Sequence, residues 1–365
     1  MSKRIIISGG GTGGHIYPAI AIANALKMED PSIDILFVGA EGKMEMEKVP
    51  KAGYHIVGLP IVGIKREVSL DNAAFPLKLT RSLLKARTVL RSFRPDVAVG
   101  VGGFASGPLL MVASLLRIPI LIQEQNSYAG ITNKLLARRA KTICVAYPGM
   151  ESFFAKRKIK LLGNPVRSDI IGSSSKRLEA LAHFGFANHR KTLFIMGGSL
   201  GARSINESIR EGLKALNDSG YQIIWQTGKA YIQTAREAIA QVGSERTKAF
   251  DFLYQMDLAY AAADVVISRA GALSVSELCL AAKPAILVPY PAASEDHQTK
   301  NAMSLIRQNA ALLVTDAYAH RDLIETAIRL LEDPGKQKEL KTNIAKLARP
   351  DAATEIAHEV MKLID

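Results

Sequence analysis

Two segments of the chain share one pattern, in which an apolar run ends in a glycine-rich loop and a helix-forming run follows. The first is residues 5–26, IIISGGGTGGHIYPAIAIANAL, and the second is residues 191–216, KTLFIMGGSLGARSINESIREGLKAL. A strand, a turn of bare backbone and a helix open a βαβ unit, in which N–H groups at the helix N-terminus can hold an anion. The chain therefore offers two places at which a doubly wound α/β domain can begin.

Short apolar runs alternate with helix-length runs along the rest of the sequence. Strands are predicted over residues 4–9, 33–39, 96–102, 118–124 and 140–146, and again within 222–228, 263–271, 283–290 and 310–316. Because these runs are apolar on both faces, they indicate central strands of parallel sheets. The predicted fold class is α/β, with two Rossmann-like doubly wound domains in tandem. Asn164-Pro165, which breaks any helix, marks the predicted joint between them.

Charge and composition narrow the classes of partner. The 365 residues include 47 basic and 34 acidic ones, a balance of +13 that suits phosphorylated substrates or an anionic membrane surface. Aromatic residues make up only 6%, without basic–aromatic interleaving, so nucleic acid is not an expected partner. Cys144 and Cys279 stand in separate apolar runs, which predicts no disulfide and a reducing cytoplasm. No stretch is long and uninterrupted enough to predict a membrane-spanning helix.

The first glycine loop has two interpretations. Gly9, Gly11 and Gly14 satisfy GxGxxG, and the loop is expected either to bind an anionic substrate or to serve only as a tight turn. It lacks the Lys-Ser/Thr ending of a P-loop, which argues against ATP or GTP hydrolysis. Together with Glu41 after the second predicted strand, the same glycines leave a dinucleotide-dependent oxidoreductase as an alternative.

His15 stands where this loop becomes a helix. A helix N-terminus favours the neutral imidazole, which can act as a base or as a hydrogen-bond partner. The alternative is that His15 merely caps the helix. No HxH, HExxH or carboxylate cluster accompanies it, so a metal site is not predicted.

In the second half, Ser199 lies in the loop MGGSLGAR and is available to donate to a phosphate group. Further on, Glu277 follows small residues in an apolar setting, where a carboxylate could bind the vicinal hydroxyls of a ribose. The spacing of Ser274 and Glu277 is equally that of a helix capping box, and the pattern alone does not separate the two.

Residues 63–94 hold eight basic and two acidic residues, contributing +6 to the total of +13, with leucines between the charges. Such a segment either lies on an anionic membrane surface or has its leucines in the core and its charges in water.

Taken in order, the motifs GGGTGGHIYPAIAIA, GVGGFASGP, QEQN, LLGNPVR, MGGSLGAR, RAGALSVSE and DHQTKNA resemble those of the MurG family of bacterial peptidoglycan glycosyltransferases. The resemblance implies a GT-B fold, with two Rossmann-like domains facing across a cleft. It implies transfer of N-acetylglucosamine (GlcNAc) from UDP-GlcNAc to the 4-hydroxyl of lipid I, the undecaprenyl-linked acceptor, with inversion. No cofactor and no metal are expected, because the sequence has no DxD motif.

The resemblance also implies the site residues. His15 would be the catalytic base or would orient the attacking hydroxyl. Acceptor and sugar contacts would come from Thr12, Gly13, Gly14 and Asn126, and the donor pyrophosphate would meet Ser199 and Arg167. The uracil would lie by Leu253 and the nucleotide along Ala272, Leu273, Ser274, Val275, Ser276 and Glu277, with Glu277 on the ribose. Gln298 and Asn301 would contact the sugar hydroxyls.

Domain roles and location follow from the same resemblance. Residues 1–164 would face the acceptor and the membrane, with the helix 350–365 packing back on them, and residues 165–349 would bind the UDP-sugar. The enzyme would be peripheral, at the cytoplasmic face of the inner membrane, docked by residues 63–94, with cell-wall synthesis proteins as possible partners. Phe104 stands where many relatives have tyrosine, so no hydroxyl role is assigned there.

Overall fold

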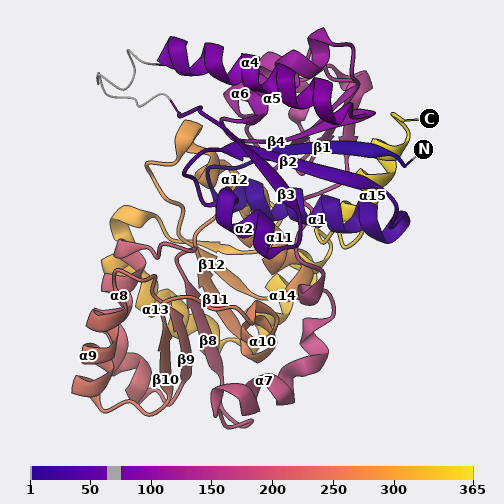
Figure 1. Ribbon diagram of the computed structural model, residues 1–365. Helices are drawn as coiled ribbons and strands as arrows, with labels where there is room; N and C mark the ends of the chain where they lie inside the picture. Colours follow the sequence, from indigo (N-terminus) through magenta and orange to yellow (C-terminus); the bar gives the residue numbers. More distant parts are fainter. Residues whose placement is uncertain (1, 64–74, 365) are drawn as a thin grey trace. The chain divides into compact units, whose positions relative to one another are not determined.

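The computed structural model of the chain describes residues 2–63 and 75–364. Its contacts divide into two compact units (Figure 1). The first unit is Met1–Val166 together with Asp351–Asp365, and the second is Arg167–Pro350. The chain thus leaves the first unit, builds the whole of the second and returns.

The first unit is built on a seven-stranded sheet in the order β3-β2-β1-β4-β5-β6-β7, in which every neighbouring pair is parallel. Its strands are β1 (Arg4–Gly9), β2 (Asp34–Ala40), β3 (His55–Leu59), β4 (Val97–Gly102), β5 (Ile120–Glu124), β6 (Thr142–Val145) and β7 (Ile159–Leu161). The five strands predicted in this half are confirmed, with ends that differ by no more than two residues.

Helices cover both faces of this sheet (Figure 1). They are α1 (Gly13–Glu29), α2 (Glu45–Lys51), α4 (Phe75–Phe93), α5 (Ser106–Leu115), α6 (Ile131–Leu136) and α15 (Ala352–Met361). Because side chains alternate along a strand, Ile5 and Ile7 face the layer of α1 and α15, while Ile6 faces α4 and α5. The returning helix α15 packs against α1 through Ile356, Ala357 and Val360, all fully buried.

The second unit repeats the architecture with a six-stranded parallel sheet in the order β10-β9-β8-β11-β12-β13. The strands are β8 (Thr192–Met196), β9 (Gln222–Gln226), β10 (Thr247–Phe250), β11 (Val265–Ser268), β12 (Ala285–Leu287) and β13 (Leu312–Leu313). The helices are α7 (Arg177–Phe184), α8 (Arg203–Asp218), α9 (Ile232–Val242), α10 (Met256–Ala262), α11 (Ala272–Ala281), α12 (His297–Ile306), α13 (Ala319–Glu332) and α14 (Pro334–Ala345).

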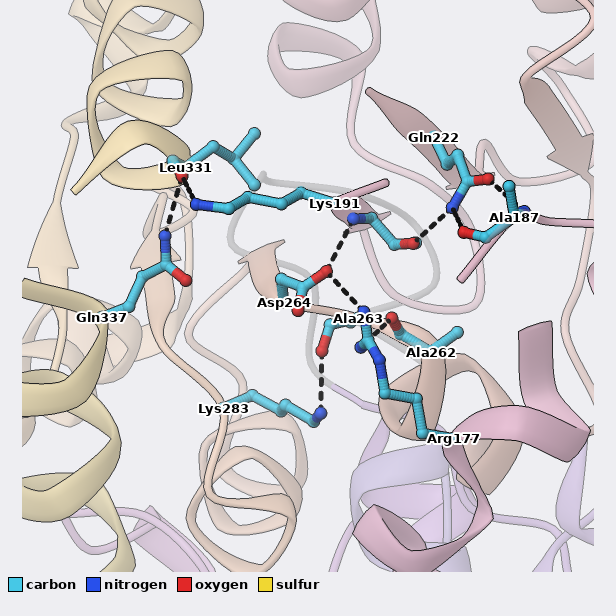
Figure 2. A network of polar contacts seen from close by, with 11 residues as sticks. Arg177, Ala187, Lys191, Gln222, Ala262, Ala263, Asp264, Lys283, Leu331 and Gln337 are labelled. Atoms are coloured by element: carbon cyan, nitrogen blue, oxygen red, sulfur yellow. Dashed lines mark hydrogen bonds and ion pairs between the residues drawn. The ribbon is translucent and has the colours of Figure 1, made fainter. Parts of the chain in front are cut away.

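A polar network ties the amino ends of this second sheet together (Figure 2). Asp264, directly before β11, accepts hydrogen bonds from Arg177 Nη2 at 3.0 Å and from the backbone N–H of Thr192 at 2.8 Å. Lys283, just before β12, donates to the carbonyl of Ala263 at 2.7 Å. The half-buried side chains of Arg177, Asp264 and Lys283 are thus paired at this edge, and the loops that carry the predicted site leave the opposite edge of the sheet.

In each sheet the strand order reverses beside the first strand. The point lies between β1 and β4 in the first unit and between β8 and β11 in the second. Loops leaving the carboxyl ends of strands at such a point diverge, and ligands of open α/β sheets bind in the resulting crevice. Both predicted glycine loops, after β1 and after β8, lie at these points.

Candidate functional site

The predicted site residues gather at the carboxyl edge of their own sheet in each unit. In the first unit, Thr12, Gly13, Gly14 and His15 follow β1, and Asn126 follows β5. In the second unit, Ser199 follows β8, Leu253 follows β10, the run Ala272–Glu277 follows β11, and Gln298 lies in α12, after β12. Each unit therefore has one loop-built site region at the position that parallel sheets use for ligands.

Two glycine loops of the first unit pack backbone against backbone. A Cβ atom on Gly103, whose φ is +89°, would lie 2.3 Å from the carbonyl oxygen of Gly10. Any side chain at Gly103 would therefore separate the loop after β4 from the loop after β1. The glycines here provide close approach as well as turn geometry.

His15 is held by the loop that precedes it. Its Nδ1 atom lies 3.1 Å from the carbonyl oxygen of Gly10 and 3.4 Å from Thr12 Oγ1. Because a carbonyl can only accept, Nδ1 must carry the hydrogen, and in the neutral ring the lone pair is then on Nε2. The ring edge lies against Gly102, where a Cβ atom would be 2.8 Å from Nε2.

The capping alternative for His15 does not hold. The N-cap residue of α1 is Thr12, and its side chain makes no capping hydrogen bond. His15 is half-buried inside the first turn, after the N-cap position, and its ring bonds the loop carbonyl of Gly10.

Glu45, which the sequence did not single out, is a fully buried carboxylate behind this loop. Its Oε2 accepts the N–H of Gly11 at 2.9 Å, and its Oε1 accepts the N–H of Ala40 at 3.0 Å. Two glycines make room for it, since a Cβ on Gly10 would lie 2.1 Å from Oε1 and one on Gly39 would lie 2.5 Å from Cγ. Glu45 thereby fixes the glycine loop to the end of β2.

A second buried carboxylate, Glu124 of the QEQN motif, shapes the loop that carries Asn126. Its Oε1 accepts the N–H of Asn126 at 3.0 Å, and its Oε2 accepts the N–H of Gly130 at 2.9 Å and the amide of Asn133 at 2.8 Å. The half-buried Asn126 is thus set by Glu124 at the carboxyl end of β5.

The glycine loop of the second unit, after β8, packs against the residues at the end of β9. A Cβ on Gly201 would lie 2.0 Å from the carbonyl oxygen of Thr227, and Gln226 Nε2 donates to the Gly198 carbonyl at 3.1 Å. The same Gln226 accepts the N–H of Leu253 at 3.2 Å through Oε1. Ser199, at the tip of the loop, is exposed.

Glu277, which is buried, contacts the buried Tyr260 and the half-buried Arg167. Its Oε2 accepts from the hydroxyl of Tyr260 at 3.1 Å, and its Oε1 is 3.6 Å from Arg167 Nε. Burial raises the pKa of Glu277, against the opposing effects of Arg167 and the Tyr260 hydroxyl. Arg167 is therefore a partner of the predicted ribose carboxylate. The capping-box interpretation of Ser274 and Glu277 is wrong, because the N-cap of α11 is Gly271 and no side chain caps it.

The remaining predicted residues of the second unit differ in accessibility. Ala272, Leu273, Ser274 and Ser276 are half-buried at the start of α11, and Val275 is buried. Gln298 Oε1 accepts the N–H of Tyr290 at 2.9 Å. Leu253 is 3% exposed, and Asn301 is fully buried and donates to the carbonyl of Ala270 at 3.2 Å. In this structure Leu253 and Asn301 thus support the loops.

Of the basic segment predicted over 63–94, residues 64–74 lie outside the described residues, and the description covers residue 63 and residues 75–94. Along α4, Leu77 and Leu84 are 56% and 60% exposed, and Arg81 and Lys85 are exposed beside them. Ser82, Ala86 and Leu90 form the buried side of the helix. Within residues 2–63 and 75–364, no helix is both long and apolar enough to cross a bilayer.

Across the same described ranges, no three His, Cys, Asp or Glu side chains are grouped so that they could hold a metal ion. Glu41, the acid of the dinucleotide alternative, is ion-paired with Lys85 at 2.7 Å at the surface.

Two doubly wound parallel sheets with glycine loops at their switch points define a GT-B glycosyltransferase fold. Residues 5–145 match the glycosyltransferase family 28 N-terminal domain and residues 192–356 match the family's C-terminal domain. This chain belongs to glycosyltransferase family 28.

Named relatives support the assignment. A Phocaeicola vulgatus protein, 56% identical over 99% of this chain and 96% of its own length, is named UDP-N-acetylglucosamine--N-acetylmuramyl-(pentapeptide) pyrophosphoryl-undecaprenol N-acetylglucosamine transferase. The crystal structure of Acinetobacter baumannii MurG matches with a TM-score of 0.78 at 27% identity, over 99% of both chains. A UDP-GlcNAc 2-epimerase from Neisseria meningitidis shares the fold, with a TM-score of 0.69 at 15% identity over 99% of this chain and 100% of its own.

Proposed function

We propose that this protein transfers GlcNAc from UDP-GlcNAc to the 4-hydroxyl of undecaprenyl-diphospho-N-acetylmuramyl-pentapeptide, converting lipid I to lipid II in peptidoglycan synthesis. The observation that carries the proposal is the 56% identity, along almost the whole chain, to a relative named for this transfer. The family's motifs are present in order, and the residues that they contribute stand at the carboxyl edges of the two sheets.

The second unit binds the donor in this proposal. The diphosphate meets the exposed backbone and hydroxyl of Ser199, and the ribose hydroxyls meet Glu277 at the start of α11. Arg167, 3.6 Å from Glu277, adds positive charge on this side of the unit. Donors fixed before reaction stabilise the charge that grows on the leaving diphosphate without having to reorganise. Gln298 contacts the sugar, while Gln226 and Asn301 hold the loops in shape.

The first unit binds the acceptor with Thr12, Gly13, Gly14 and Asn126, and His15 takes the proton. The acceptor oxygen forms a bond to the anomeric carbon as the bond from that carbon to UDP breaks, so the configuration inverts. The proton goes to the Nε2 lone pair of His15, which the Gly10 contact orients. A positioned base of this kind contributes about 10²–10⁴-fold to the rate.

Turnover of radiolabelled UDP-GlcNAc with a short-chain lipid I analogue tests the function. We expect label in the lipid product and little transfer from UDP-N-acetylgalactosamine. Conversion of the nucleotide sugar without transfer to any acceptor, by a protein that binds UDP, would contradict the proposal and favour epimerase chemistry.

Membrane docking by α4 belongs to the same proposal, at the cytoplasmic face where lipid I is presented. Leu77, Arg81 and Leu84 recur at helical spacing on the exposed side of α4, so apolar and cationic groups share one face. We expect the protein to sediment with vesicles that contain anionic lipid, and less so as salt screens the charges.

A Leu77→Ser/Leu84→Ser variant should lose this binding. Leu178→Ser, at a residue that is 69% exposed in α7 of the second unit, is the matched control and should bind like the wild type. Equal sedimentation of the two variants would exclude α4 as the docking surface.

A further inference from the structure

We propose that Glu45 is a positioning residue for the reaction and acts on His15 through the peptide group between Gly10 and Gly11. The inference rests on the proposed function, because it presupposes that His15 takes the acceptor proton. It assigns a role to a carboxylate that contacts no substrate in the proposed site.

The contacts run through one peptide group. The N–H of Gly11 donates to Glu45 Oε2 at 2.9 Å, and the C=O of Gly10 accepts from His15 Nδ1 at 3.1 Å. This C=O and this N–H belong to the same planar unit, since the bond between Gly10 and Gly11 joins them. The Glu45 carboxylate is therefore hydrogen-bonded to one end of this peptide group, and the His15 imidazole is hydrogen-bonded to the other end.

A peptide group can transmit the effect of the charge. Hydrogen bonds in series polarise one another, by roughly 10–30% per bond. A carboxylate that accepts the N–H of Gly11 polarises the peptide group. The carbonyl oxygen of Gly10 then carries more negative charge and is a stronger hydrogen-bond acceptor. The stronger acceptor holds the Nδ1 hydrogen of His15, keeps the lone pair on Nε2 and stabilises the imidazolium that forms when the proton arrives. In serine proteases a carboxylate does this by direct contact with the histidine.

The charge of Glu45 distinguishes this role from a purely architectural one. Glu45 is fully buried, and its two backbone N–H hydrogen bonds offset the cost of burying the carboxylate beside the Gly10–Gly11 peptide. A negative charge behind Gly11 opposes an acceptor diphosphate on the same loop, so it does not assist ground-state binding. It does favour a positive charge on His15, which exists only once the proton has moved. Removing the charge should therefore lower kcat without raising KM for either substrate, and KM for the acceptor should stay the same or fall.

The tautomer of His15 in the wild-type protein is the first test. With ¹⁵N-labelled histidine, the ring resonances of His15 are identified by their loss in His15→Ala. We expect the wild-type ring in the Nδ1–H form and a mixture of both tautomers in Glu45→Gln. An Nε2–H form in the wild type would overturn the proposal without any variant at Glu45.

A double-mutant cycle is the second test. We expect Glu45→Gln to reduce kcat by about 10–100-fold in the wild type but by less than about twofold in His15→Ala, because the two residues act as one unit. Glu47→Gln, on the same helix with a side chain 61% exposed, is the control and should match the wild type.

The outcomes of the cycle separate the two claims. An equal reduction by Glu45→Gln in both backgrounds would make Glu45 architectural and overturn this inference. Near-wild-type turnover by His15→Ala would instead remove His15 as the base, which is a failure of the proposed mechanism. Thermal midpoints and UDP affinity, read in the same samples, report whether each variant is folded.

Discussion

Replacing Gly201 by alanine tests how closely the donor loop depends on the backbone beside it. At φ +80° an alanine is strained, and its Cβ would lie 2.0 Å from the Thr227 carbonyl oxygen, where ordinary contact begins at 3.4 Å. The left-handed conformation costs about 1–2 kcal/mol, and the overlap, which needs a shift of about 1 Å or more, costs about 1–3 kcal/mol. The loop that carries Ser199 should therefore be displaced as well as destabilised.

Calorimetric titration with UDP and urea unfolding measure the two effects separately. For a displacement of about 1 Å we expect UDP affinity to fall measurably and turnover to fall by about 10²-fold. Gly243→Ala is the control, because Gly243 has φ +65° but nothing within 4 Å of an added Cβ. It should lose about 1–2 kcal/mol of stability with UDP affinity unchanged. Unaltered affinity in Gly201→Ala, with a stability loss no larger than that of the control, would refute this reasoning.

Three further predictions concern buried titratable groups. Burial raises the pKa of Glu277 above its ordinary 4.5, so the fold favours the protonated form. The unfolding free energy of the wild type, measured in urea, should therefore fall relative to Glu277→Gln as pH rises from 4.5 towards neutrality. Burial lowers the pKa of Lys283 to about 8, so the charged amine costs stability below that pH. The wild type should gain stability relative to Lys283→Met between pH 8 and 10.5, by at most about 1.4 kcal/mol per pH unit in the same assay. Burial raises the pKa of both thiols, that of Cys279 to about 12, so a thiol reagent at neutral pH should modify Cys144 and Cys279 only after denaturant is added, which mass spectrometry would detect.

The strands and glycine loops were predictable because their causes are local. Residues 4–9 are apolar on both faces, as a central parallel strand must be, and they form β1 with those bounds. The loops after β1 and β8 could be placed at strand ends for the same reason. Glycines that lie between an apolar run and a segment with helical periodicity indicate a strand-to-helix turn.

The contacts that organise the site were not predictable, because their partners are distant in the sequence. Glu45 is a charged residue in a polar stretch, and only the fold brings Gly11, 34 residues away, to its carboxylate. Asn301 is expected to contact the sugar, and the structure adds a hydrogen bond from its Nδ2 to the carbonyl of Ala270, 31 residues away. The spacing of Ser274 and Glu277 fits a capping box, but α11 begins after Gly271, so Ser274 falls inside the helix.

Because α15 packs on the first unit, the two units are completed in a fixed order during translation. Residues Arg167–Pro350 are contiguous, so the second unit can close before α15 is made. The first unit cannot, because the α1 surface that Ile356 and Val360 cover stays open until α15 has left the ribosome. At about 5–20 residues per second the wait lasts for many seconds. The unit whose first strand is translated earlier is thus completed later, and throughout that interval the apolar side chains that α15 covers in the finished fold stay exposed to water.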